Sequence, residues 1–98
     1  MSREEFKESA KKRIDDIFDK IDDLEGKKDE VVAGIKEEYA EMLEELKEKR
    51  DEAKEKFDEL EEAGEEKWDE VKEAFSSASE SFKEGFTKIG SIFRKSEG

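Results

Sequence analysis

The stretch that decides the fold is residues 35–93, IKEEYAEMLEELKEKRDEAKEKFDELEEAGEEKWDEVKEAFSSASESFKEGFTKIGSIF. Apolar or small residues recur in it at intervals of eleven. Three series can be followed: Ile35, Leu46, Phe57 and Trp68; Met42, Ala53, Gly64, Phe75 and Phe86; and Leu60, Val71, Phe82 and Phe93. Eleven residues make three turns of about 3.67 residues, close to the natural α-helix. The spacing therefore predicts one apolar stripe along one face of a long helix.

The composition of the chain fits a long helix better than a compact globule. Of its 98 residues, 53% are charged and only 32% are apolar, which is typical of coiled coils. Proline is absent, so no residue forces a helix to stop. No apolar run approaches the length of a membrane span, and residues 1–12 contain no signal-peptide core. We therefore expect a soluble, cytoplasmic, all-α protein.

Several classes of chemistry are excluded by the residues that the chain lacks. There is no Cys and no His, which removes disulfides, thiolate chemistry, zinc sites built on those ligands and histidine general-base catalysis. The net charge of −12 repels nucleic acid. We expect no cofactor, no metal, no nucleic-acid partner and no small-molecule substrate.

The N-terminal part of the chain carries its own apolar series. Ser2 and Glu5 have the spacing of a capping box that begins a helix. Steps of three and four residues follow, and after an interruption at Lys28 the series resumes in register. Its members are Phe6, Ala10, Ile14, Ile17, Ile21, Leu24, Val31 and Ile35.

Two glycines are candidate breaks in this helix. Gly26 could end one helix, with Asp29 capping the next. Gly64 could end another, although Glu65 and Glu66 are poor caps. Because the stripe continues in register past both positions, we favour a continuous helix. Breaks at both would instead give three arms and a compact three-helix bundle. The section between Leu46 and Phe57 holds only Ala53 as an apolar residue, so helices approach closely there or the helix is weak.

The composition changes at Ser76. In residues 81–98 four bases (Lys83, Lys88, Arg94, Lys95) outnumber two acids (Glu84, Glu97), which leaves +2 there and −14 in the rest. The serines at 76, 77, 79 and 81 are compatible with a hinge, but the apolar alignment favours one helix to about Phe93 and fraying beyond it. We divide the chain into an acidic coiled-coil helix, residues 1–75, and an amphipathic C-terminal tail, residues 76–98.

The chain resembles a family of small, acidic, bacterial coiled-coil proteins, which includes proteins described as hypothetical or stress-response proteins. The likeness rests on the segments EYAE at residues 38–41, LKEKRDEA at 46–53, and ELEEA at 59–63 leading to WDEVK at 68–72. This resemblance implies a helical, soluble, non-enzymatic protein and supplies no catalytic residues.

Sites of other kinds fit the sequence poorly. Carboxylate pairs such as Asp15 with Asp16, or Glu65 with Glu66, radiate outward from a helix, whereas a cation site needs oxygens that converge. Trp68, at helical spacing from Val71 and Phe75, is expected in a core rather than stacked on a ligand. The chain is therefore predicted not to be an enzyme.

Two sets of residues are candidates for association. The first, called here the association stripe, comprises Ile14, Ile21, Leu24, Ile35, Met42, Leu46, Phe57, Leu60, Trp68, Val71 and Phe75. The second, called here the tail face, is a candidate for contact with a membrane or a partner and comprises Phe82, Phe86, Ile89 and Phe93. We expect a homo-oligomer built through the stripe. The alternatives are a peripheral lipid binder that uses the tail, and a stress-protective helix that folds when water is scarce.

Overall fold

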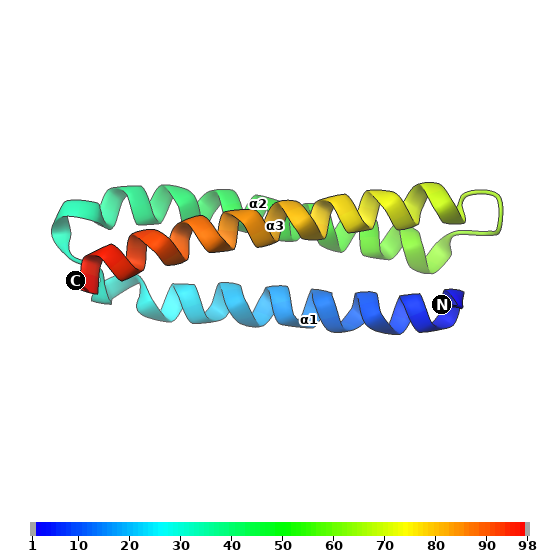
Figure 1. Cartoon of the computed structure of the whole chain (residues 1–98), viewed down its shortest axis with the longest axis horizontal. Helices are drawn as coiled ribbons and strands as arrows, with labels where there is room; N and C mark the ends of the chain where they lie inside the picture. The colour runs from blue at the N-terminus through cyan, green and yellow to red at the C-terminus, as the bar shows by residue number, and fades with distance from the viewer. Residues whose placement is uncertain (1, 98) are drawn as a thin grey trace.

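The computed structural model is an antiparallel bundle of three long helices (Figure 1). It describes residues 2–97, and their side chains as far as Arg94. Its elements are α1 (Arg3–Lys27), the short 3-10 helix η1 (Lys28–Glu30), α2 (Ala33–Glu62) and α3 (Trp68–Glu97). The predicted all-α class is confirmed, whereas the outer ends of the two predicted segments, Met1 and Gly98, lie outside the described residues.

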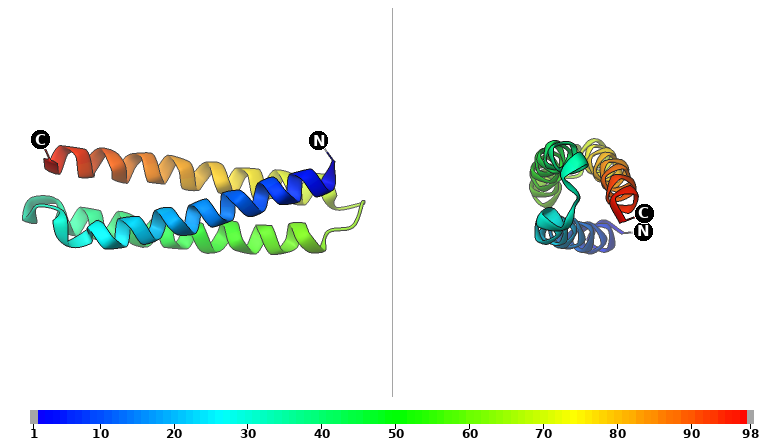
Figure 2. Two further views of the ribbon diagram at one scale, coloured as in Figure 1. Left: turned by 90° about the horizontal axis from the view of Figure 1, so that it is seen from below. Right: turned by 90° about the vertical axis from the view of Figure 1, so that its left-hand side faces the viewer.

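The three helices form a rod of 50 × 18 × 16 Å. Successive helices reverse direction, so α1 and α3 run the same way and the two ends of the chain lie at opposite ends of the rod (Figures 1 and 2). Helix α3 packs along α2, and α1 crosses obliquely over this pair (Figure 2). Of the three interfaces between helices, the joint between α1 and α3 consequently has the fewest contacts and is called thin below.

Helix α1 begins where the sequence predicts. The Glu5 N–H donates to the Ser2 hydroxyl at 3.1 Å, which satisfies one of the free amides at the start of the helix. Glu4 and Glu5 place negative charge at the positive end of the helix dipole. The inward face of α1 then buries Phe6, Ala10, Ile14, Ile17, Ile21 and Leu24.

The prediction of continuity at Gly26 is wrong, because α1 ends at Lys27 and α2 starts at Ala33. Gly26 itself lies inside α1, and the chain turns through η1 and two extended valines, Val31 (ψ 147°) and Val32 (ψ 151°). Folding back buries Val31, which is 6% exposed. Tertiary burial here outweighs the few helical hydrogen bonds that the turn gives up, each about 1 kcal/mol net.

Continuity at Gly64 is also wrong, since α2 ends at Glu62 and α3 begins at Trp68. Ala63 leaves the helical conformation with ψ 133°, and the Lys67 N–H closes a turn onto the Gly64 carbonyl at 3.2 Å. The fold is thus the alternative, a three-helix bundle. A single extended helix would leave the apolar stripe exposed to water, whereas the bundle buries seventeen apolar residues of the described chain. Each large one contributes about 1.5–3 kcal/mol.

The serine-rich segment contains no hinge, in agreement with the sequence prediction. Helix α3 passes through it unbroken, and the predicted boundary between residues 75 and 76 falls inside this helix. The Ser79 hydroxyl donates to the Phe75 carbonyl at 3.2 Å, and the Thr87 hydroxyl donates to the Lys83 carbonyl at 3.0 Å. Bonds of this kind accommodate Ser and Thr in a helix. The helix extends to Glu97, past the fraying predicted beyond Phe93.

Helices α2 and α3 approach closely where the apolar series is thin. Ala53, the one apolar residue between Leu46 and Phe57, is fully buried. Of the two explanations for this section, a close approach of helices is therefore confirmed, and a weak helix is not. A Cβ atom placed on Gly85 would lie 2.7 Å from Cδ2 of Leu46, so only glycine fits that contact without a shift. Nearby, the Lys49 ammonium donates to the Ser81 hydroxyl at 2.9 Å. Small residues here let the two backbones draw together.

Ala53→Leu is expected to destabilise the bundle by about 1–3 kcal/mol, because a larger side chain at this fully buried position forces the packed helices apart. Urea denaturation followed by circular dichroism measures the change. The control is Ala33→Leu, which adds the same side chain at an exposed position and should change stability by less than about 0.5 kcal/mol. Equal effects of the two variants would contradict this account of the packing.

Candidate interaction surfaces

The association stripe lies inside the bundle. Seven of its members are buried: Ile14, Ile21, Leu24, Leu46, Phe57, Leu60 and Phe75. The other four, Ile35, Met42, Trp68 and Val71, are half-buried and pack against them. Ala78 is a buried residue that the sequence argument missed, although its position three residues after Phe75 and four before Phe82 was the available signal. The stripe is the hydrophobic core of a single folded chain.

The tail face also points inward in the folded bundle. Phe82 and Ile89 are 2% and 0% exposed, while Phe86 and Phe93 are half-buried against the core. Phe82 stacks on Phe86 with ring centroids 6.3 Å apart, and Phe93 lies 6.2 Å from the ring of Tyr39 on α2. Contact between these rings and any outside surface therefore requires α3 to lose part of its packing.

Where α1 and α3 meet, aromatic rings and long basic side chains fill the joint. At the N-terminal end of α1, Phe6 packs edge-on against Trp68 at 5.8 Å. Further along, lysines bridge the two helices: Lys20 lies 4.9 Å from the Phe86 ring and Lys27 lies 5.4 Å from the Phe93 ring. Such contacts are worth about 0.5–1 kcal/mol each at exposed sites. The lysine stems cover ring edges that a closer helix would otherwise bury.

A groove of about 250 Å³ interrupts this joint between α1 and α3. The groove lies beside Ser79, which is seven residues before Phe86 and fourteen before Phe93 and so lies on the same face of α3. Because a serine side chain is too small to reach α1, the space is left open. Asp16 and Lys20 on its wall pair with each other at 2.9 Å. The groove is lined by Arg13, Asp16, Ile17, Lys20, Ser79, Glu80, Phe82 and Lys83.

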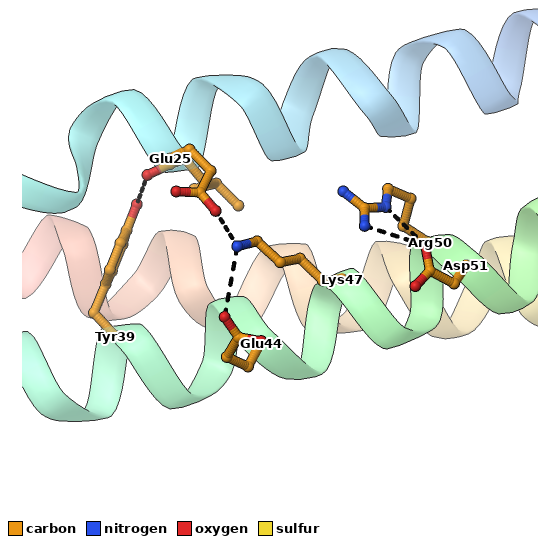
Figure 3. A network of polar contacts seen from close by, with 7 residues as sticks. Glu25, Tyr39, Glu44, Lys47, Arg50 and Asp51 are labelled. Atoms are coloured by element: carbon orange, nitrogen blue, oxygen red, sulfur yellow. Dashed lines mark hydrogen bonds and ion pairs between the residues drawn. The ribbon is translucent and has the colours of Figure 1, made fainter.

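A polar network ties the end of α1 to α2 (Figure 3). The buried Tyr39 hydroxyl donates to the Leu24 carbonyl at 2.7 Å, which satisfies an acceptor near the C-terminus of α1. Lys47 forms ion pairs with Glu25 on α1 and, at 3.5 Å, with Glu44. Figure 3 also shows Arg50 paired with its neighbour Asp51. These contacts fix the α1–α2 hairpin at its turn.

The network shifts three pKa values. The hydrogen bond from Lys47 lowers the pKa of the Glu25 carboxyl from its usual 4.5, and the same bond raises the pKa of Lys47. Burial raises the pKa of Tyr39, with the charges of Asp23, Glu25 and Glu30 adding to the shift. Tyr39 is thereby kept protonated, in the form that donates to α1.

The described carboxylates do not converge. Asp15, Asp16, Glu65 and Glu66 are exposed, and the described residues contain no group of three potential metal ligands. No described polar or charged side chain is buried, apart from the tyrosine hydroxyl of the core. No helix of residues 2–97 has the length and hydrophobicity needed to cross a membrane.

Comparison of the chain with models of protein families, with curated proteins and with solved structures finds no match. The resemblance to small acidic bacterial coiled-coil proteins therefore stays a prediction.

The Glu25 ion pair gives a testable pH dependence. Because the folded pKa lies below 4.5, the unfolded chain takes up the proton first, so the pair stabilises the fold above that pH and ceases to do so as the pH falls through the lowered value. Glu25→Gln should remove this part of the acid sensitivity in urea denaturation across pH 3–7. Lys47→Met should remove the same part, since it deletes the other partner. If either variant keeps the wild-type slope, the pair is not formed in solution.

Proposed function

We propose that this is a non-enzymatic protein that acts by helix association, and that its first partner is a second copy of itself. The observation that carries the proposal is the apolar stripe, which runs in helical register from Phe6 to Phe93 across both turns of the chain. Among the residues that the structure describes, the core holds no polar group other than the Tyr39 hydroxyl. A second copy of the chain carries helices with the same spacing and the same small residues, so one of its helices can take the place of a native helix in such a core.

The surface area of the chain supports association. The monomer exposes 6680 Å² for a mass of 11.4 kDa, whereas a typical monomer of this mass exposes about 5800 Å². The difference of about 900 Å² is close to the area that one partner buries in a standard interface. The elongated shape of the bundle, 50 × 18 × 16 Å, contributes to this excess. The exposed surface that a partner could cover includes a large apolar side chain, Phe18, which is 39% exposed.

Sedimentation equilibrium tests this function. We expect an average mass that rises above 11.4 kDa between micromolar and near-millimolar protein, and a melting temperature that rises with concentration. Both follow from mass action on a state that only the folded chain can form. A mass that stays at the monomer value over the whole range would reject self-association.

Lipid binding through α3 is a second candidate, favoured by one observation. Helix α3 has the strongest separation of apolar and polar faces of the three helices, and the thin α1–α3 joint is the side on which it can be uncovered. The acidic body is repelled by anionic lipid, so a neutral, highly curved surface suits the tail best. The same proposal places the protein in the cytoplasm, at the periphery of a membrane.

Flotation with small neutral vesicles tests the lipid function. Phe86→Ser should reduce flotation, because it removes a half-buried ring from the lipid-facing side. Ile21→Ala should increase flotation, since it weakens α1 packing by about 2–5 kcal/mol and leaves α3 unchanged. Wild-type protein that does not float, or an Ile21→Ala variant that floats less, would reject lipid binding by opening of the bundle.

A further inference from the structure

We propose that the second copy binds by exchange of α3: the link at residues 63–67 straightens, α2 and α3 become one helix, and each α3 packs on the α1–α2 hairpin of the other chain. This inference rests on the proposed self-association and names its mechanism. The result is a closed, two-fold dimer in which every contact of α3 is kept but is made between chains. Two 50 Å bundles end to end give a rod of about 100 Å.

The apolar stripe passes through the link at helical spacing. Leu60, Gly64, Trp68 and Val71 follow one another at steps of four, four and three residues. A straightened link therefore places the buried faces of α2 and α3 on one side of a single helix.

Little in the link resists straightening. Ala63 has φ −67°, already the helical value, and only its ψ of 133° departs from the roughly −42° of a helix. No described glycine has a positive φ, and a Cβ atom on Gly64 would meet nothing within 4 Å. The Gly64 carbonyl accepts from Lys67 and the Glu65 carbonyl from Trp68, in the same direction as helical bonds. Rotation about one ψ angle begins the conversion.

The other link, at residues 28–32, is held in its turn by specific contacts. For this reason α3, and not α1, is the helix that is exchanged. At residues 28–32 two valines are extended, and Val31 is buried. The hydrogen bond from Tyr39 to Leu24 and the ion pair of Lys47 with Glu25 hold the two arms of that hairpin together. The α1–α2 hairpin therefore stays within one chain.

Two substitutions in the link move the exchange in opposite directions. Gly64→Ala fits the closed turn and favours the continuous helix, by up to about fivefold per link and about 30-fold for the two links of a dimer. Glu65→Pro fits the second position of the turn that Lys67 closes onto Gly64, and it should disfavour a straightened link by at least about 100-fold. Glu65→Ala removes the same charge without the ring and serves as the control.

The experiment is sedimentation equilibrium of the full chain and these variants, each refolded from urea at high protein concentration so that exchange can occur. We expect more dimer for Gly64→Ala, wild-type behaviour or slightly more dimer for Glu65→Ala, and monomer for Glu65→Pro. A wild-type chain that never dimerises rejects self-association itself. A wild-type dimer that Glu65→Pro leaves intact rejects only the exchange, because the association then uses another surface.

A disulfide trap provides an independent readout. The chain has no Cys, and a Cβ atom on Gly85 would lie 3.7 Å from Leu46 Cγ, so Leu46→Cys with Gly85→Cys introduces a unique pair across α2 and α3. In an exchanged dimer, oxidation links two chains, and denaturing electrophoresis shows a covalent dimer. Oxidised dimer fractions that run as monomers under denaturing conditions would overturn the exchange.

Discussion

Burial of one continuous apolar stripe is the constraint on which the rest of the structure depends. A charged chain with a single apolar face has no other large source of stability, since its surface ion pairs contribute only a few tenths of a kcal/mol each. The stripe needs partners on the scale of a whole helix. With 98 residues, the chain supplies these itself by reversing twice, at residues 28–32 and 63–67.

The helical class and most of the core could be predicted from spacing alone. Steps of three and four residues place Ile14, Ile21 and Leu46 on one face whether the helix is long or folded back, so these residues are buried in either case. The two turns could not be predicted this way. Neither glycine marks its turn by a left-handed conformation, and Gly26 lies inside α1. The turns form because α1, α2 and α3 bury one another, which is a property of the whole chain.

The role of the tail face was equally hidden from the sequence. Periodicity fixes which side of α3 is apolar but not what covers it, because a lipid surface and a neighbouring helix select the same spacing. The structure shows that neighbouring helices cover it: Phe93 lies 6.2 Å from Tyr39 of α2, and Lys20 of α1 lies over the Phe86 ring. Beside this face, Gly85 admits Leu46 of α2. The fit of glycine to leucine is specific to a neighbouring helix, and it could be recognised only once the register of α2 and α3 was known.

The same spacing that conceals the turns also makes alternative assemblies accessible. A sequence with strong turn signals, such as proline or a left-handed glycine, would favour the folded-back chain over a straight helix by several kcal/mol. Here the link at residues 63–67 lacks both, so the closed bundle and an exchanged dimer share nearly all their contacts and differ chiefly in the backbone conformation of this link and in the entropy of association. Protein concentration then decides between them, because only the dimer gains from it.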